Sequence, residues 1–203
     1  PFLYSPCILA GMTNNFLFDL VAPLYDHVIG FDTSEQLLPL LKLNGTQRLL
    51  DAGGGTGRLT QRIAPHTAES WIADLSMPML RKAQEKSIAE LANTSTTALP
   101  FANDTFDRIL IVDALHHFPD QIGTLAELWR VLKPGGRLVI EEPNIHKFGV
   151  KMVALGEKLA LMGSHFHSPE EIAYMMNRLP LAQVMLEIGK THPAWIIADK
   201  RAN

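Results

Sequence analysis

A glycine-rich turn followed by an acidic residue carries the clearest chemistry in this chain. Residues 49–57 read LLDAGGGTG, an apolar strand that runs into glycines. Glycines let a backbone approach a ligand closely, and a helix that begins after Gly57 directs its free N–H groups at an anionic group. Asp74 ends the next strand-like run, and a carboxylate can accept two hydrogen bonds from a ribose diol. This arrangement predicts a nucleoside-binding site, the alternative for Asp74 being a helix-capping acid.

The glycine spacing separates one class of nucleoside cofactor from another. A dinucleotide site requires G-x-G-x-x-G/A, in which the last small residue allows close packing of helix on strand. Counted from Gly53 and Gly55 the third position is Arg58, and counted from Gly55 and Gly57 it is Thr60. Both frames fail, so a nicotinamide dehydrogenase is disfavoured.

Residues 51–57 instead form the pattern D-x-G-x-G-x-G, which resembles the first motif of the class I S-adenosylmethionine-dependent methyltransferases. Three further segments resemble that family in the same order: 99–101 (LPF), 106–120, and 132–136 (LKPGG). Residues 18–26 resemble the segment before the core of the ubiquinone/menaquinone-biosynthesis type, methyltransferase type 11. The resemblance covers residues 14–145 and implies S-adenosyl-L-methionine as cofactor and S-adenosyl-L-homocysteine as product.

The resemblance implies roles around the methionine part and the ribose of this cofactor. Gly53, Gly55 and Gly57 would line the methionine part. Asp51 would order the loop and could reach the methionine amino group through water. Asp74 would bind the ribose hydroxyls.

The contacts to the adenine are expected to differ from those in the family, because one residue departs from the family pattern. Leu75 would flank the adenine, but Ser95 stands where relatives often carry an acid that binds the adenine amino group. Adenine recognition would then depend on Ser95, Thr96 or the backbone, unless these are simply strand residues. Tyr25, in the segment that covers the cofactor in relatives, would lie near the cofactor carboxylate or else only pack there.

Candidate catalytic residues follow the fourth strand. Asp113 and His116 fall where the family places residues between cofactor and acceptor, and His116 or His117 could act as a base because histidine titrates near about 6.5. Alternatively, one histidine caps the helix expected at Pro119 and the other packs under the loop. One of the two glutamates at 141–142 is expected at the site rim, unless it is solvated. No histidine spacing resembles a metal motif, so no metal is expected.

The order of elements predicts an α/β fold: a Rossmann-like, doubly wound, mostly parallel seven-stranded sheet with helices on both faces and an antiparallel C-terminal hairpin. The expected strands are 48–51, 71–74, 94–98, 108–112, 137–141, 182–188 and 195–198. A single domain would consist of a helical cap (1–45), a cofactor-binding core (46–145), a helical lid for the acceptor (146–179) and the hairpin (180–203).

The amino-acid composition limits the kinds of partner and location that are expected for this chain. The 203 residues are 47% hydrophobic and 19% charged, typical of one globular domain, and the net charge of −3 with scattered basic residues disfavours nucleic acid. Cys7 is the only cysteine, which fits a cytoplasmic location. No run approaches the ~20 apolar residues of a membrane span, so no integral membrane association is expected.

These observations together predict an S-adenosylmethionine-dependent methyltransferase with a small, apolar or aromatic acceptor. C-methylation of a quinol-type substrate is the nearest match, and the Met-containing apolar stretch 147–162 favours a lipophilic acceptor. O- or N-methylation of another small metabolite, and a non-catalytic S-adenosylmethionine-binding protein, stay open as alternatives, as does a homodimer.

Overall fold

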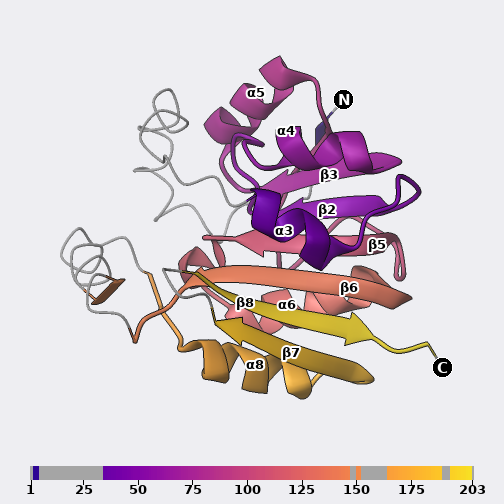
Figure 1. Ribbon diagram of the computed structural model, residues 1–203. Helices are drawn as coiled ribbons and strands as arrows, with labels where there is room; N and C mark the ends of the chain where they lie inside the picture. The colour runs from indigo at the N-terminus through magenta and orange to yellow at the C-terminus, as the bar shows by residue number, and fades with distance from the viewer. Residues whose placement is uncertain (1, 5–33, 147–149, 152–163, 189–192, 203) are drawn as a thin grey trace.

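A twisted sheet forms the centre of the computed structural model, which describes residues 2–4, 34–146, 150–151, 164–188 and 193–202 (Figure 1). The strand order is β1-β4-β3-β2-β5-β6-β8-β7. Pairing is parallel from β1 through β6 and antiparallel where β8 meets β6 and β7. The doubly wound sheet and its C-terminal hairpin are confirmed, and β1 adds an eighth strand to the seven expected.

The strands are β1 (Phe2–Tyr4), β2 (Arg48–Ala52), β3 (Glu69–Asp74), β4 (Glu90–Asn93), β5 (Phe106–Val112), β6 (Leu132–Pro143), β7 (Ala182–Ile188) and β8 (Pro193–Lys200). The helices are α3 (Ser34–Leu41), α4 (Thr60–Ile63), α5 (Met77–Lys86), α6 (Gln121–Val131) and α8 (Pro169–Asn177), with short 3₁₀ turns η2 (Ala64–His66) and η3 (Leu115–His117).

Two hydrophobic layers cover the sheet. Leu37 of α3 and Ile63 of α4 pack on one face against Leu110 of β5, and Leu80 of α5 packs on the same face farther along. On the other face, helices α6 and α8 pack against a larger cluster that includes Ile109 of β5. In Figure 1, α3 lies in front of the sheet and α6 behind it. Successive residues of β5 thus face opposite layers, which explains its near-continuous apolar sequence.

The third strand differs from the expectation. The threonines of 94–98 favoured a strand, but the strand β4 ends at Asn93 and residues 94–98 turn. Leu91 and Ala92 of β4 are buried against the sheet, whereas the Thr94 hydroxyl bonds locally to the Ala98 carbonyl at 3.0 Å. Local hydrogen bonds of this kind compete with strand pairing and override the β propensity of threonine.

Two helices begin at the capping residues that the sequence shows. Ser76 caps α5 by accepting from the Met79 N–H, and Ser168 with Glu171 forms a complete capping box on α8. The expected hairpin strand at 182–188 coincides with β7. The spacing of apolar residues also predicts helices at 13–29 and 147–162, and a joint near Gly189 between the hairpin strands. These segments lie outside the described residues, apart from residues 150–151, which are helical.

One buried arginine ties three elements together. Arg137 of β6 forms a bidentate ion pair with Asp199 of β8 (Nε–Oδ1 2.6 Å, Nη2–Oδ2 2.7 Å), and its Nη1 donates to the Leu40 carbonyl of α3 at 2.7 Å. The Arg137 side chain is 8% exposed and the Asp199 side chain 41%. The pair therefore links the antiparallel hairpin to the parallel part of the sheet and to α3.

Replacing Arg137 with alanine should destabilise the fold. Removing one partner of a buried pair costs about 3–5 kcal/mol, and we expect about 2–3 kcal/mol because Asp199 remains partly hydrated. The free energy of unfolding in urea measures this loss. The exposed Arg201→Ala variant is the control, expected within about 0.5 kcal/mol of the unmodified chain. Equal losses in both variants would contradict a special role for Arg137.

Candidate functional site

The candidate site lies at the carboxyl ends of the central strands. The strand order runs outward from β2 to β3 and β4 on one side and to β5 and β6 on the other. Open α/β sheets bind ligands in the crevice at such a switch point. A cavity lies there, lined by Asp51 of β2, residues 53–56, 58 and 59 of the glycine loop and its flank, the last residue of β5, Val112, and Asp113.

The glycine loop needs its glycines. Gly53, Gly55 and Gly57 all have positive φ angles, of 75°, 53° and 72°. A Cβ added at Gly57 would lie 2.8 Å from Cδ1 of Ile72, and one at Gly53 would lie 2.9 Å from Cζ of Phe118. The loop therefore has no side chains at these positions, which leaves its backbone open to close approach by a ligand.

Asp74 fastens this loop to the neighbouring strand. Its Oδ2 accepts the Gly55 N–H at 2.9 Å, and its Oδ1 accepts the Ser76 N–H at 2.7 Å. The second contact is the helix-start interaction that was the alternative for this residue. It does not exclude a ligand, because each carboxylate oxygen can accept more than one hydrogen bond.

Asp51 is a buried carboxyl group at the floor of the cavity, 3% exposed. Burial raises its pKa from 3.8 to about 6; the Thr60 hydroxyl, which donates to Oδ2 at 2.5 Å, opposes the shift, and the nearby Asp74 charge adds to it. Ionisation of Asp51 therefore costs stability as the pH rises from 3.8 to about 6. A cationic group in the cavity would favour the ionised form.

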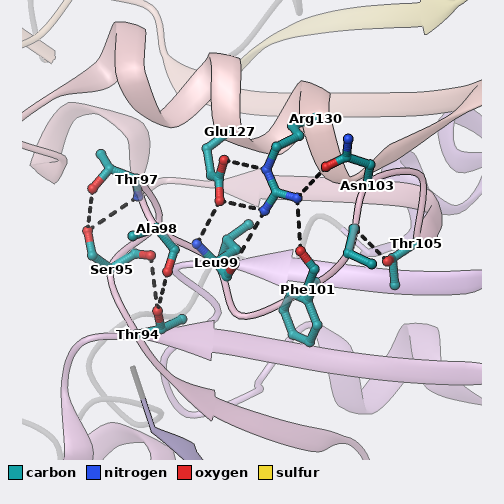
Figure 2. Close-up of polar contacts among 11 residues, drawn as sticks. Thr94, Ser95, Thr97, Ala98, Leu99, Phe101, Asn103, Thr105, Glu127 and Arg130 are labelled. Carbon is teal, nitrogen blue, oxygen red and sulfur yellow. Dashed lines mark hydrogen bonds and ion pairs between the residues drawn. The ribbon is translucent and has the colours of Figure 1, made fainter. Parts of the chain in front are cut away.

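Of the residues expected near adenine, Ser95 and Thr96 lie on the loop after β4, and Leu75 directly follows β3. The Ser95 hydroxyl is 2.8 Å from that of Thr97, and it also accepts the Thr97 N–H (Figure 2). The buried Thr96 hydroxyl lies 2.9 Å from that of Thr124 in α6. Leu75 is half-buried, and its carbonyl accepts from the Asn93 side chain at 2.9 Å. Adenine contacts by these residues remain a prediction.

Sequence reasoning missed the pair that holds this loop. Glu127 accepts the Leu99 N–H at 2.8 Å, while Arg130 donates to the Phe101 carbonyl at 2.9 Å and to Asn103 at 2.7 Å. Figure 2 shows both side chains reaching from α6 to the loop. Their i, i+3 spacing on a helix was the available signal. Hydrogen bonds from Arg130 lower the pKa of Glu127, so the pair stays ionised.

The two histidines after β5 differ in environment. The Nδ1 of His116 lies 2.7 Å from Oε2 of Glu142, and its ring stacks on Phe166 at 4.2 Å between centroids. Burial, and then the charge of His116, lowers the pKa of His117 to about 3, and its Nδ1 lies 3.1 Å from the Ser164 hydroxyl. His117 is therefore neutral near pH 7 and a poor base, so the chemistry favours His116.

The alternative in which a histidine caps the following helix is wrong. Helix α6 begins at Gln121, and its N-cap is Asp120, whose carboxylate accepts the Gly123 N–H at 2.8 Å. The histidines instead form the short turn η3, which lies between β5 and that helix.

Asp113 has an unusual backbone. It is exposed, its φ is 51°, and its N–H donates to the Glu141 carbonyl at 2.9 Å. A positive φ is uncommon outside glycine and costs of order 1 kcal/mol or more. This conformation places Asp113 at the cavity opposite the glycine loop.

The structure therefore gathers most of the expected residues at one end of the sheet. Asp51, Gly53, Gly55 and Asp113 line the cavity together. Gly57 and Asp74 flank the same loop, whereas Ser95, Thr96 and Leu75 lie towards β4, and the histidines lie beyond Asp113. Tyr25 lies outside the described residues.

The described ranges contain neither a metal-binding cluster nor a membrane-spanning helix. No three His, Cys, Asp or Glu side chains there are placed to hold a metal ion. No helix in those ranges is long and apolar enough to cross a membrane.

Known proteins share both the sequence pattern and the fold. A model of the methyltransferase domain, type 11, matches residues 50–140. A ubiquinone/menaquinone biosynthesis C-methyltransferase of Erwinia tasmaniensis is 32% identical over 165 residues, which cover 70% of this chain and 66% of that protein. A demethylmenaquinone methyltransferase of Lactiplantibacillus plantarum is 36% identical over 63% of this chain and 61% of its own length. The chain thus spans slightly less than two thirds of these relatives.

Solved structures agree on the architecture. The crystal structure of an S-adenosylmethionine-dependent methyltransferase from Thermotoga maritima superposes with a TM-score of 0.76, covering 92% of this chain and all of that one, at 19% identity. At this identity the likeness shows the fold alone, while the domain match and the curated relatives carry the assignment. The glycine loop, the sheet and these similarities agree: the chain is similar to the class I S-adenosylmethionine-dependent methyltransferases in its methyltransferase-domain segment and in its fold.

Proposed function

We propose that this chain binds S-adenosyl-L-methionine along the glycine loop and transfers its methyl group to a small-molecule acceptor, releasing S-adenosyl-L-homocysteine. The observation that supports the proposal is the glycine loop beside the cavity. Its glycines have positive φ angles, its Gly55 N–H donates to Asp74, and the buried carboxyl group of Asp51 lines the same cavity. These features fit the ligand: the loop admits its chain, Asp51 suits its ammonium group, and Asp74 suits its ribose hydroxyls.

The proposed chemistry is an in-line displacement. The sulfonium of the cofactor supplies an activated methyl group, so the C–S bond breaks as the acceptor atom bonds to the methyl carbon and the electron pair stays on sulfur. The chain mainly has to orient the two reactants. His116 would take the proton that the acceptor loses, because burial lowers the pKa of His117 to about 3 and makes that ring a poor base.

The acceptor is proposed to be a quinol-type ring that is methylated on carbon. Support comes from the names of two curated relatives, a ubiquinone/menaquinone biosynthesis C-methyltransferase and a demethylmenaquinone methyltransferase. Residues 164–167 of the expected lid segment contact the turn that carries His116, which supports an acceptor site beside that histidine: the His165 N–H donates to the His116 carbonyl at 2.7 Å, and Gln121 donates to the His165 carbonyl at 2.7 Å. O- or N-methylation of another metabolite is the second candidate.

The proposal also covers the domain organisation, the class of acceptor, the cellular location and the oligomeric state. The cap (1–45), core (46–145), lid (146–179) and hairpin (180–203) would act as one domain around this site. Its net charge of −3 supports a small-molecule acceptor over nucleic acid, and its single cysteine supports a cytoplasmic location. A homodimer is an option that light scattering of the purified chain would test.

A binding and transfer experiment tests the proposal. We expect S-adenosylmethionine and S-adenosylhomocysteine to bind in calorimetry and NAD not to bind. We also expect a short-chain demethylmenaquinol to gain one methyl group on its ring, read by mass spectrometry, while a catechol and an amine gain none. Methylation of the catechol or amine alone would favour the second candidate. Binding without transfer would favour a non-catalytic protein, and absence of binding would contradict the proposal.

The Asp74→Ala variant should bind S-adenosylhomocysteine more weakly. Loss of hydrogen bonds to a charged group costs about 1.5–3 kcal/mol, or roughly 10- to 150-fold in Kd. Calorimetry measures the change, and thermal unfolding verifies that the variant is folded. Glu85→Ala, which removes an exposed charge on α5, is the matched control and should bind normally. An unchanged Kd in Asp74→Ala would remove this residue from the site.

Binding should also depend on the protonation of Asp51. Its pKa of about 6 means that the free protein holds this carboxyl protonated below that pH. Because the cofactor's ammonium group would favour the ionised form, binding there must release a proton, and affinity should fall by up to about tenfold per pH unit below 6. Calorimetry across pH measures the slope. Asp51→Asn should abolish it, and an identical slope in that variant would assign the titration to another group.

A further inference from the structure

A buried carboxylate at the end of β6 makes contacts that the proposed function has not used. Glu142 is 3% exposed. Its Oε1 accepts two backbone N–H groups, from Ala114 at 3.1 Å and from Leu115 at 2.7 Å. Its Oε2 lies 2.7 Å from Nδ1 of His116. One side chain thus holds both the loop after Asp113 and the imidazole that follows it.

The contacts of Oε1 favour one direction for the hydrogen bond to His116. Oε1 accepts two backbone N–H groups, and a carboxylate that acts as the acceptor has no proton to donate from its other oxygen. With Glu142 as the acceptor, Nδ1 carries the proton that it shares with Oε2. In the neutral imidazole the lone pair is then left on Nε2.

The ring has little freedom to choose another arrangement. Phe166 stacks on it with an interplanar angle of 17°, and His117 lies on it with centroids 4.0 Å apart. The His116 side chain is 3% exposed, so no bulk water competes for the Nδ1 proton. A buried, acceptor-only partner on Nδ1 both selects the tautomer and stabilises the imidazolium that forms when Nε2 takes a proton.

We propose that Glu142 is a positioning residue that holds His116 as the Nδ1–H tautomer, so that Nε2 is the nitrogen that takes the acceptor's proton. This assignment rests on the proposed methyl transfer for its use in catalysis, while the tautomer itself rests on the hydrogen bonds alone. It makes the end of β6 part of the site, together with β2, β3 and β5.

The Glu142→Gln variant tests the assignment because its neighbours determine the orientation of the glutamine side-chain amide. The two backbone N–H groups of Ala114 and Leu115 require an oxygen, so the glutamine amide group must turn its NH₂ towards His116. That NH₂ donates to Nδ1, which forces the proton onto Nε2. The substitution keeps the size of the side chain and inverts the tautomer.

The primary measurement is the ¹⁵N spectrum of the histidine rings, with His116 assigned by comparison with a His116→Asn variant. We expect protonated Nδ1 in the unmodified chain and protonated Nε2 in Glu142→Gln. We also expect kcat to fall by about 10²- to 10⁴-fold, as for loss of a general base, while KM for S-adenosylmethionine changes less than about twofold.

Glu141→Gln is the matched control. Glu141 precedes Glu142 on β6 and faces the other side of the sheet, where it accepts from the Trp195 indole at 3.2 Å. The same change of charge there should leave the His116 tautomer and kcat unaltered.

The assignment fails if His116 of the unmodified chain carries its proton on Nε2, a result that needs no folded variant. It also fails if Glu142→Gln inverts the tautomer and leaves kcat unchanged. Because the spectrum is recorded without an acceptor, failure of the proposed methyl transfer is distinguished from failure of the tautomer assignment.

Discussion

The hydrogen bond from the Gly55 N–H to the Asp74 carboxylate, 2.9 Å long, is the interaction on which the site depends. It joins the loop after β2 to the end of β3, and the same carboxylate holds the start of α5 through Ser76. The loop carries no side chains at its turning points, so it has few contacts of its own to hold its shape. An ionised acceptor on the neighbouring strand supplies this order and also faces the place where a nucleoside would bind.

Buried acids recur around this loop, and each is compensated differently. Asp51 keeps a raised pKa because one hydroxyl, from Thr60, does not offset its loss of hydration. Glu142 has three hydrogen-bond partners, two backbone N–H donors and the His116 imidazole. A poorly compensated carboxyl is poised to respond to a cation, whereas a fully compensated one fixes geometry. The two acids thus suit a ligand contact and a positioning role, respectively.

Helix α6 supports the site from the opposite side. The Glu127–Arg130 pair fixes the backbone of residues 99–103, and this loop continues into Ser95 and Thr96 (Figure 2). At the other end of the same helix, Gln121 holds the backbone of His165 beside His116. One rigid element therefore fixes both the expected adenine side and the expected acceptor side of the cavity.

The sequence alone determined the alternation of strands and helices from β2 to β8, the glycine loop and the acid at the end of β3, because these depend on local signals: buried apolar runs, glycine spacing and helix caps. The tertiary structure decided which side chains meet across elements. Thr94 leaves the sheet through a hydroxyl contact with Ala98, Thr96 bonds to Thr124 at 2.9 Å, and Glu142 meets His116 although 26 positions separate them. Such contacts depend on strand register and on the packing of helices, which no local pattern encodes. The pKa difference between Asp51 and the exposed acids has the same origin, since burial belongs to the folded chain.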